Sequence, residues 1–385
     1  MPDRHAPQLV IKIDGESTLQ GDHGESLDMR LGENILGATV DLRLDNPDMF
    51  SVEFNMKKFE KMALLDAFKA GGEVSIAMGL NEAAVELCVG EIAYIEPSFD
   101  ADTGFRTTIS GYHKLHRLTR GQRSKTWGDG LQPTQAPTTA VKQVINDSKA
   151  QQGGTSDSLS AGKLSATTVK HDYIPQLNVS DFEFLRAIGA SLEFKADPTG
   201  QKGVEFVKPE ANASPVLKLS WERPQQQDKT GGLVLSANLR LSTVQQYAAV
   251  EVRSWDFKTK KNIVATVTSS TYNFKGEAGK DAAGKALYGN AGSGRKYVVV
   301  DQPVNSKDEA TALAQALFDQ FSMDFMTGEL TVQGSPKLLP GKTVELVGFG
   351  KACTGVYLIT SATHVFRPSE GYRTTIAVSR NAKAS

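Results

Sequence analysis

Strand-like stretches of hydrophobic and polar residues recur along most of this chain and predict a mainly β protein. The clearest is AAVEVRSWDF at residues 248–257, where apolar and polar positions alternate with the two-residue period of a half-buried strand. Other stretches of this kind are LVIKIDG, GATVDLRLDN, LVLSANLRLS, LEFKAD and VEFVKP. The 35 glycines and the many Val, Thr and Ile residues support a turn-rich, largely β fold.

A few segments instead show helical spacing of apolar residues. Helices are expected at 57–70, ended by Gly71 and Gly72, from Pro137 onward, after Ser180 and after Ser306. Ser180 with Glu183, and Ser306 with Glu309, have the spacing of capping boxes, and Val179 can pack on Phe184. The expected buried positions are Phe59, Met62, Leu65, Phe68, Val141, Val144, Ile145, Leu185, Ile188, Leu192, Ala310, Leu313, Leu317 and Phe321.

One strand motif is written twice. GFRTTISG (residues 104–111) returns as GYRTTIAV (371–378), each after a C-x-G at Cys88 or Cys353 and a turn that ends in glycine. A two-residue difference in loop length reconciles the copies. Chance recurrence of Thr-Thr-Ile is the alternative, but the extended match favours duplication. The two cysteines are then expected on equivalent strands of different modules, which disfavours a disulfide between them.

These patterns divide the chain into three parts. We predict a first β-barrel-like module at 1–118, a small α+β middle domain at 119–225, and a second β-barrel-like module at 226–385. Within the middle domain, the Gly/Ser/Thr-rich stretch 151–166 has no apolar period and is expected to be a mobile loop. The length of 385 residues agrees with more than one domain.

Composition narrows the function classes. The net charge of −1 argues against a dedicated nucleic-acid or membrane-surface binder, which normally has a basic excess. Two cysteines without a CxxC pair disfavour a disulfide framework or zinc knuckle. The N-terminal apolar run is too short for a signal peptide, and no stretch approaches the ~20 apolar residues of a membrane span. We therefore expect synthesis in the cytoplasm, and no membrane anchoring.

Four motifs partly match known binding motifs for metal ions, phosphate or nucleic acid, but none has the full pattern. His113 and His116 have no third metal ligand nearby, and solvated histidines are the alternative. The Gly-rich segment 289–296 lacks the ending of a phosphate-binding loop, and the turn at Asp100 lacks the final Glu of a calcium loop. The basic stretch 113–127 could be a nucleic-acid arm, but an interdomain linker against an acidic surface is favoured. We expect no catalytic, cofactor-binding or metal-binding residues and no enzyme activity.

Several long segments resemble one known family. ELCVGEIAYIEPSFDADTGFRTTISGYHKLHRLTRGQRSKTW is similar to the end of the first barrel of baseplate hub proteins of contractile tails, with His113 where the family has an Asp. YIPQLNVSDFEFLRAI, VEVRSWDFKTKK and the C-terminal segment from GSPKLLPGKTVELVGFG resemble its middle and last parts, with Phe257 where Pro is common. The family includes phage late-control D proteins, hubs of tailocins and extracellular injection systems, and the hub portion of VgrG spikes.

The resemblance implies a ring-shaped homotrimer that adapts a six-fold tail tube to a three-fold spike. The implied partners are a trimeric spike protein below, a hexameric tail-tube initiator above, baseplate wedge proteins, and tape-measure protein or cargo in the lumen. The location would be the baseplate of a phage tail or an extracellular injection particle. Because VgrG chains continue beyond this point, the spike is expected to be a separate polypeptide. The alternatives are a tail-associated cell-wall hydrolase and a carbohydrate-binding β protein that acts alone.

Overall fold

The computed structural model is mostly β, as predicted, with one sheet of 13 strands and several small sheets. The structure describes residues 7–14, 16–17, 34–44, 46–55, 68–80, 84–102, 104–127, 136–151, 159–164, 170–171, 174–189, 194–196, 203–206, 209, 213–222, 231–272, 274 and 294–381.

Six strands of the large sheet close into a β-barrel. Around the barrel the order is β19 (Thr343–Val347), β13 (Leu217–Ser220), β14 (Gly231–Leu241), β18 (Met326–Gln333), β21 (Gly371–Arg380) and β20 (Gly355–Arg367). The barrel closes because β20 also pairs with β19. β13 lies in this barrel although the sequence division at residue 225 puts it in the middle domain. Its parallel pairings with β14 and with the distant β19 are tertiary contacts that leave no local signal.

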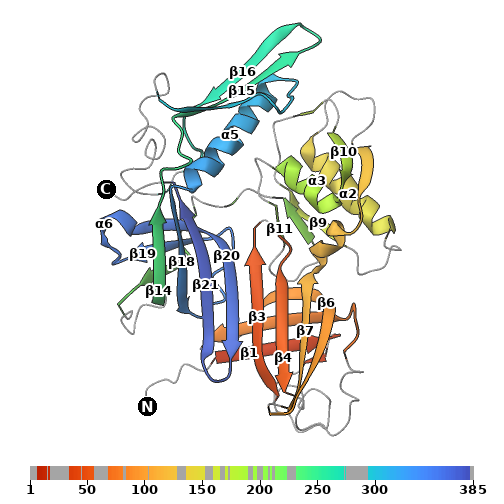
Figure 1. Ribbon diagram of the computed structural model, residues 1–385, viewed down its shortest axis with the longest axis vertical. Helices are drawn as coiled ribbons and strands as arrows, with labels where there is room; N and C mark the ends of the chain where they lie inside the picture. The colour runs from red at the N-terminus through yellow and green to blue at the C-terminus, as the bar shows by residue number, and fades with distance from the viewer. Residues whose placement is uncertain are drawn as a thin grey trace.

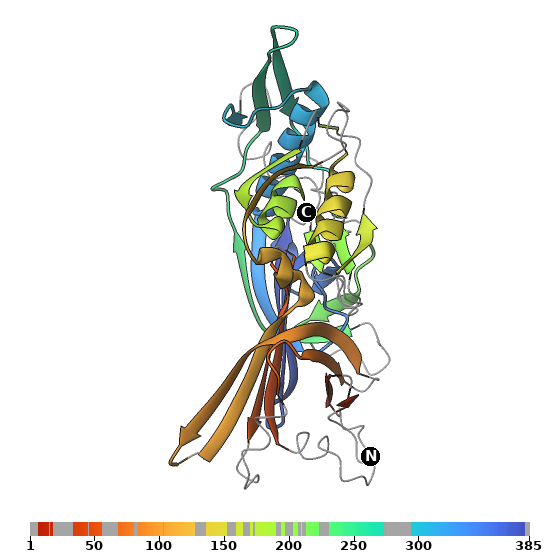
Figure 2. The same ribbon diagram turned by 90° about the vertical axis from the view of Figure 1, so that its right-hand side faces the viewer.

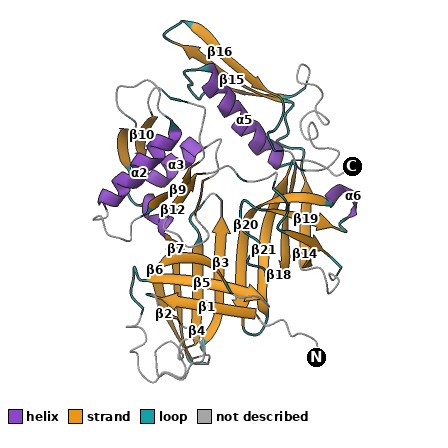
Figure 3. Ribbon diagram, turned by 180° about the vertical axis from the view of Figure 1, so that it is seen from behind, coloured by secondary structure: helices purple, strands orange, loops and turns teal. Residues whose placement is uncertain are grey.

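The other strands of the large sheet form an open half. Their order is β3 (Ile35–Arg43), β4 (Met49–Asn55), β7 (Gly104–His113), β6 (Val85–Asp100), β5 (Glu73–Leu80), β1 (Pro7–Ile13) and β2 (Glu16–Ser17). β1 and β5 lie across β3 and β4 (Figure 3), and the fully buried Ile11, Val40, Phe54 and Ile76 belong to one core. The β20–β3 pairing joins this half to the barrel, side by side in Figure 1.

The two halves repeat one order of strand pairing. β5–β6–β7–β4–β3 in the open half corresponds to β19–β20–β21–β18–β14 in the barrel. The register irregularities also correspond: one follows Ile92 in β6 and Ile359 in β20, and another follows Ile35 in β3 and Val234 in β14. Gly71 and Gly341, just before β5 and β19, both have positive φ, 83° and 81°.

The cysteine prediction needs a correction. Cys88 lies on β6, but Cys353 ends the short helix α6 (Gly350–Cys353), so the two do not occupy equivalent strands. The β6–β7 and β20–β21 hairpins correspond at their bulges and turns. The helical turn α6 precedes β20, and the C-x-G match gave no sign of it in the sequence. Both cysteines are free.

The middle segment packs two helices against short strands. α2 (Pro137–Gln151) buries Val141, Val144 and Ile145 as predicted, and α3 (Asp181–Ile188) begins at a complete Ser180–Glu183 capping box. β8 (Arg123–Trp127) pairs with β10 (Ile174–Val179), and β11 (Phe194–Ala196) with β12 (Gly203–Phe206).

Part of the expected mobile loop at 151–166 is a strand. β9 (Ser160–Leu164) pairs in parallel with β12, and Leu159 before it is buried. This pairing is tertiary and overrides the absence of a local apolar period. Residues 152–158 and 165–166 of the expected loop lie outside the described residues.

A separate small sheet projects from the barrel. β15 (Ala249–Asp256), β16 (Lys261–Val267) and β17 (Lys296–Val299) form it, and α5 (Lys307–Met323) packs along it at the top of Figure 1. The Ser306 side chain caps α5, but the Glu309 carboxylate accepts from Asn305 N–H instead of closing a capping box. Ala310, Ala314 and Phe318 are buried, whereas Leu313, Leu317 and Phe321 are partly buried. Most of the helix expected at 57–70 lies outside the described residues, and Phe68 is buried.

Asp48 makes the stability of the open half depend on pH. Burial raises its pKa to about 7, the Arg43 N–H that donates to Oδ1 at 3.0 Å opposes this rise, and Asp41 adds to it. Since the folded pKa exceeds the usual value near 3.8, this group stabilises the fold most at acidic pH, and the contribution disappears as pH rises through about 7. Asp48→Asn should remove this dependence.

We expect the wild type to lose about 3–4 kcal/mol relative to Asp48→Asn between pH 4 and pH 8. Urea unfolding at several pH values measures this difference, with the exposed Asp102→Asn as the control. Parallel curves for the wild type and Asp48→Asn would contradict the assignment.

Candidate functional site

The basic stretch that could have been a nucleic-acid arm folds against acidic groups of the same chain. After β7 it forms a 3-10 helix, Lys114–Thr119, and then β8. Lys114 Nζ lies 2.5 Å from Glu73 Oε2, and Arg117 pairs with Glu91. Its acidic partners come from β5, β6, α2 and α3, so the stretch joins the open half to the middle segment.

Arg123 is the centre of this junction. Its Nε donates to Asp181 Oδ1 at 2.7 Å, and its guanidinium also pairs with Asp147. Burial lowers the pKa of Arg123, but its hydrogen bonds to Asp181 and Asp147 outweigh burial and raise it. The Trp127 indole N–H donates to Gln176 Oε1 at 2.8 Å. The basic stretch is therefore a linker packed against acidic groups of the same chain, which is the interpretation that the sequence favoured.

The two histidines both contact protein groups. His113 is buried, contrary to the solvated state expected, and its Nδ1 accepts from Leu115 N–H. His116 Nδ1 lies 3.2 Å from the His113 carbonyl oxygen and its Nε2 lies 2.7 Å from Arg120 Nη2. Burial, with the charge of Arg120, lowers the pKa of His116, so both ring nitrogens engage protein groups in the neutral form. In the part of the chain that the structure describes, no three His, Cys, Asp or Glu side chains gather as metal ligands.

The structure describes most of one of the other two motifs and little of the second. The turn at Asp100 is a hairpin turn, with Gly104 at a φ of 83° and Asp102 N–H donating to the Asp100 carboxylate. Residues 289–293 of the Gly-rich segment lie outside the described residues.

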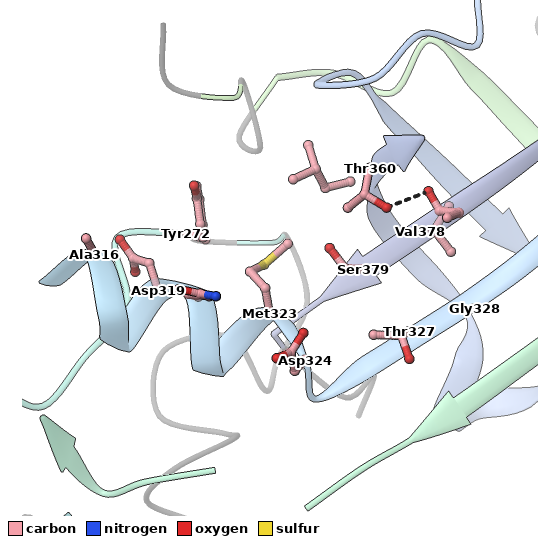
Figure 4. Close-up of a pocket in the computed structure, with 13 residues that line it drawn as sticks. Tyr272, Ala316, Asp319, Met323, Asp324, Thr327, Gly328, Thr360, Val378 and Ser379 are labelled. Carbon is pink, nitrogen blue, oxygen red and sulfur yellow. Dashed lines mark hydrogen bonds between the residues drawn. The ribbon is translucent and has the colours of Figure 1, made fainter. Parts of the chain in front are cut away.

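A pocket of about 420 Å³ lies where α5 meets the barrel (Figure 4). Asp319 on α5 points towards it, but its carboxylate accepts from Ser270 Oγ, Thr271 N–H and Thr271 Oγ1 at 2.5–2.7 Å. Thr360 Oγ1 donates to the Ala377 carbonyl oxygen, and partial burial raises the pKa of Asp324. Asp319 therefore holds the chain that follows β16 against α5.

Exposed apolar side chains, which mark contact surfaces when they gather, lie on particular strands. On β6, Tyr94 is 54% and Phe99 69% exposed, and Phe99 stacks on Phe105 at 4.7 Å near the hairpin tip. On β14, Leu235 and Leu241 are exposed. A further set on the projecting small sheet comprises Trp255, Val264, Tyr297 and Val298.

The exposed side chains of β6 lie on a projecting hairpin. The hairpin of β6 and β7, orange in Figure 2, extends away from the rest of the molecule. Sequence reasoning did not single out Tyr94 or Phe99. Their only signal is that apolar residues occupy both faces of β6 beyond Ile92, whereas a half-buried strand alternates.

Comparison with known proteins places the fold. A model of the family described as the Alg8 N-terminal domain matches residues 53–367. No curated protein matches the sequence. The 43 kDa tail protein of prophage MuSo2 from Shewanella oneidensis has a similar structure, with a TM-score of 0.64, 16% identity, and coverage of 98% of this chain and 99% of that chain.

Two other solved structures are also similar. A tail protein from Neisseria meningitidis has a TM-score of 0.59 and 12% identity over 98% of this chain and 97% of its own. The E. coli c3393 protein, described as a component of the type VI secretion system with similarity to the T4 tail proteins gp27 and gp5, has a TM-score of 0.55 and 13% identity over 97% of this chain and 77% of its own. At these identities the likeness shows a shared tail-protein fold.

Proposed function

Since the chain belongs to the family described as the Alg8 N-terminal domain and shares its fold with phage tail proteins, we propose that it is the structural hub of the baseplate of a contractile injection machine. In this proposal three copies form a ring. The ring adapts a six-fold tail tube to a three-fold spike.

One observation carries the proposal: the strand order β5–β6–β7–β4–β3 recurs as β19–β20–β21–β18–β14 within one chain. Two halves with the same strand order in each chain would let three chains present six similar units, which is the symmetry that a hexameric tube requires. The β3–β20 pairing holds the two modules edge to edge in one continuous sheet, as neighbours in a ring would be held.

The partners follow from this position. They are a hexameric tube-initiating protein on one side, a trimeric spike on the other, wedge proteins outside, and tape-measure protein or cargo in the lumen. The likeness to phage tail proteins and to a type VI secretion component supports a place in such an assembly. None of the helices that the structure describes has the length and apolar character to cross a membrane.

We also propose that the role is structural and not enzymatic. The hydrogen bonds that engage His116 and Asp319 support this, since they occupy the groups a hydrolase would need free. Release of soluble fragments from purified cell wall by the wild type, lost on Asp319→Asn, would instead support the hydrolase alternative.

The oligomeric state tests the proposal. Mass photometry of the purified chain should show a species with the mass of three 41.5 kDa chains, and electron micrographs should show rings. The expected measurement is a trimer that persists on dilution to nanomolar concentration, because obligate ring interfaces are large. A monomer at micromolar concentration would contradict the ring and favour the carbohydrate-binding alternative.

A further inference from the structure

β20 changes its neighbour halfway along its length. Before the irregularity that follows Ile359, its outer edge pairs with β19. Beyond it, from Ser361 to Phe366, the same edge pairs with β3. A bulge bends its strand, so this irregularity lies where β20 leaves one sheet edge for another.

β6 has the same irregularity, but among the described strands it gains no new neighbour beyond it. Its first part pairs with β5, and the register shifts after Ile92. Among the described strands, the part from Tyr94 to Phe99 pairs with β7 alone, and no strand pairs with its outer edge. This is the edge that corresponds to the β3-binding edge of β20.

β14 has a matching bare edge. The pairing of β14 with β18 corresponds to the pairing of β3 with β4. The register shift that follows Val234 in β14 corresponds to the shift that follows Ile35 in β3. β13 covers only Gly231 to Leu233, and no described strand pairs with the same edge of β14 beyond that point. β14 and β6 lie on opposite sides of the molecule (Figure 1), so one chain cannot join them to each other.

We propose that β6 of one copy pairs with β14 of a second copy, antiparallel and in the register that β20 and β3 use within the chain. This inference rests on the proposed ring and specifies how neighbouring chains join in it. Because the two bare edges differ, the contact is head-to-tail, and a head-to-tail contact can close into a ring. In the ring, β6 of each chain pairs with β14 of one neighbour, and β14 of each chain pairs with β6 of the other neighbour.

The correspondence of bulges and pairings fixes the register. Thr363 of β20 lies opposite Asp41 of β3, and its hydroxyl donates to Asp41 Oδ1 at 2.8 Å. The matching positions are Glu96 on β6 and Arg240 on β14. One step further along the same face, Ser98 comes opposite Asn238.

The chemistry of these positions suits the pairing. Glu96 and Arg240 are oppositely charged and exposed, and within the described part of the chain no ion pair involves either of them. Opposite charges that face each other across an antiparallel pair stabilise it, and like charges destabilise it. Exposed apolar side chains on the two edges, Tyr94 and Phe99 on β6 and Leu241 on β14, would be covered by the contact. Pro97 donates no hydrogen bond, which limits pairing with unrelated strands.

Cysteine cross-linking tests the register directly. The double variant Ser98→Cys/Asn238→Cys should form a disulfide between copies under mild oxidation, and non-reducing gels should show a covalent trimer. The matched control is Ser98→Cys/Ser236→Cys, which keeps the same face of β14 but shifts the partner by two residues. Its cross-linked fraction should be lower by about tenfold, because Cα atoms more than about 7 Å apart do not form a disulfide without backbone movement.

Charge reversal gives an independent test. Glu96→Arg places two arginines opposite each other and should raise the dissociation constant of the assembly by about tenfold or more. Glu96→Arg/Arg240→Glu should restore it, and circular dichroism should show an unchanged fold in each variant. A wild type that is monomeric would overturn the proposed ring itself. A stable trimer without cross-linking in the Ser98/Asn238 pair, or without rescue by the double reversal, would overturn this pairing while the ring stands.

Discussion

Gly111→Ala is expected to lower the free energy of unfolding by about 3–4 kcal/mol. A Cβ built at Gly111 would lie 1.9 Å from the Glu91 carbonyl oxygen and 2.8 Å from Phe50 Cζ. The first is backbone of the neighbouring strand β6 and the second belongs to a fully buried ring, so neither can move aside without separating the strands. A Cβ at Gly90 of β6 would also approach the Phe50 ring, at 2.8 Å from Cε1. The Phe50 ring therefore packs against two strands at positions where only glycine leaves enough space.

Urea unfolding measures this change, with Gly37→Ala as the control. Gly37 is also a strand glycine, but its Cβ would meet only ordinary contacts, 3.4 Å from the Phe366 carbonyl oxygen. We expect Gly37→Ala to change the free energy of unfolding by less than about 1 kcal/mol. Equal losses in the two variants would show that the close approach at Gly111 does not determine stability.

His364→Leu is expected to destabilise the protein by about 2–4 kcal/mol at neutral pH. His364 is fully buried on β20 beside the β3 junction, its Nδ1 lies 2.7 Å from the Tyr372 hydroxyl, and its Nε2 lies 3.1 Å from the Leu338 carbonyl oxygen. In the neutral ring Nε2–H donates to Leu338 and Nδ1 accepts from Tyr372. Leucine fills similar space but leaves both groups with an unmet hydrogen bond in the interior.

The pH dependence separates this role from simple packing. Burial lowers the pKa of His364 to about 4, while the Leu338 carbonyl opposes the shift. In the unfolded chain this histidine takes up a proton near its ordinary pKa of 6.5, so the wild type loses this contribution as pH falls from about 6.5 to about 4. His364→Leu should lack that loss, so the difference from wild type should shrink at pH 4.5. A gap that stays constant from pH 7.5 to pH 4.5 would contradict a neutral buried histidine.

Local elements were predictable from sequence because their signals are local. The Ser180–Glu183 capping box, the buried face of α2 and the hairpin turn at Gly104 all follow from side chains within a few residues of each other. The repeated hairpin motif, at residues 104–111 and 371–378, also predicted a β fold with related strands near both ends of the chain.

Features that depend on distant partners were not predictable. β9 becomes a strand only through its parallel pairing with β12, and β13 joins the barrel only through β14 and β19. His113 is buried at the end of β7, where it lies opposite Gly90 of β6 and its N–H donates to the Asp48 carbonyl oxygen, and neither neighbour is close in sequence. The candidate assembly edges are harder still, because a strand without a neighbour is recognised only after every other pairing is known.

The β3–β20 junction also has a consequence for the order of synthesis. Asp41 and Thr363, which meet there, are 322 residues apart in the chain. At about 5–20 residues per second, a ribosome needs about 15–65 s to travel from one to the other. Throughout that time β3 has an edge that its own chain cannot yet cover, and such edges promote aggregation. The Asp41–Arg43 ion pair places charge on that strand. These charges can protect the nascent chain until its last hairpin arrives.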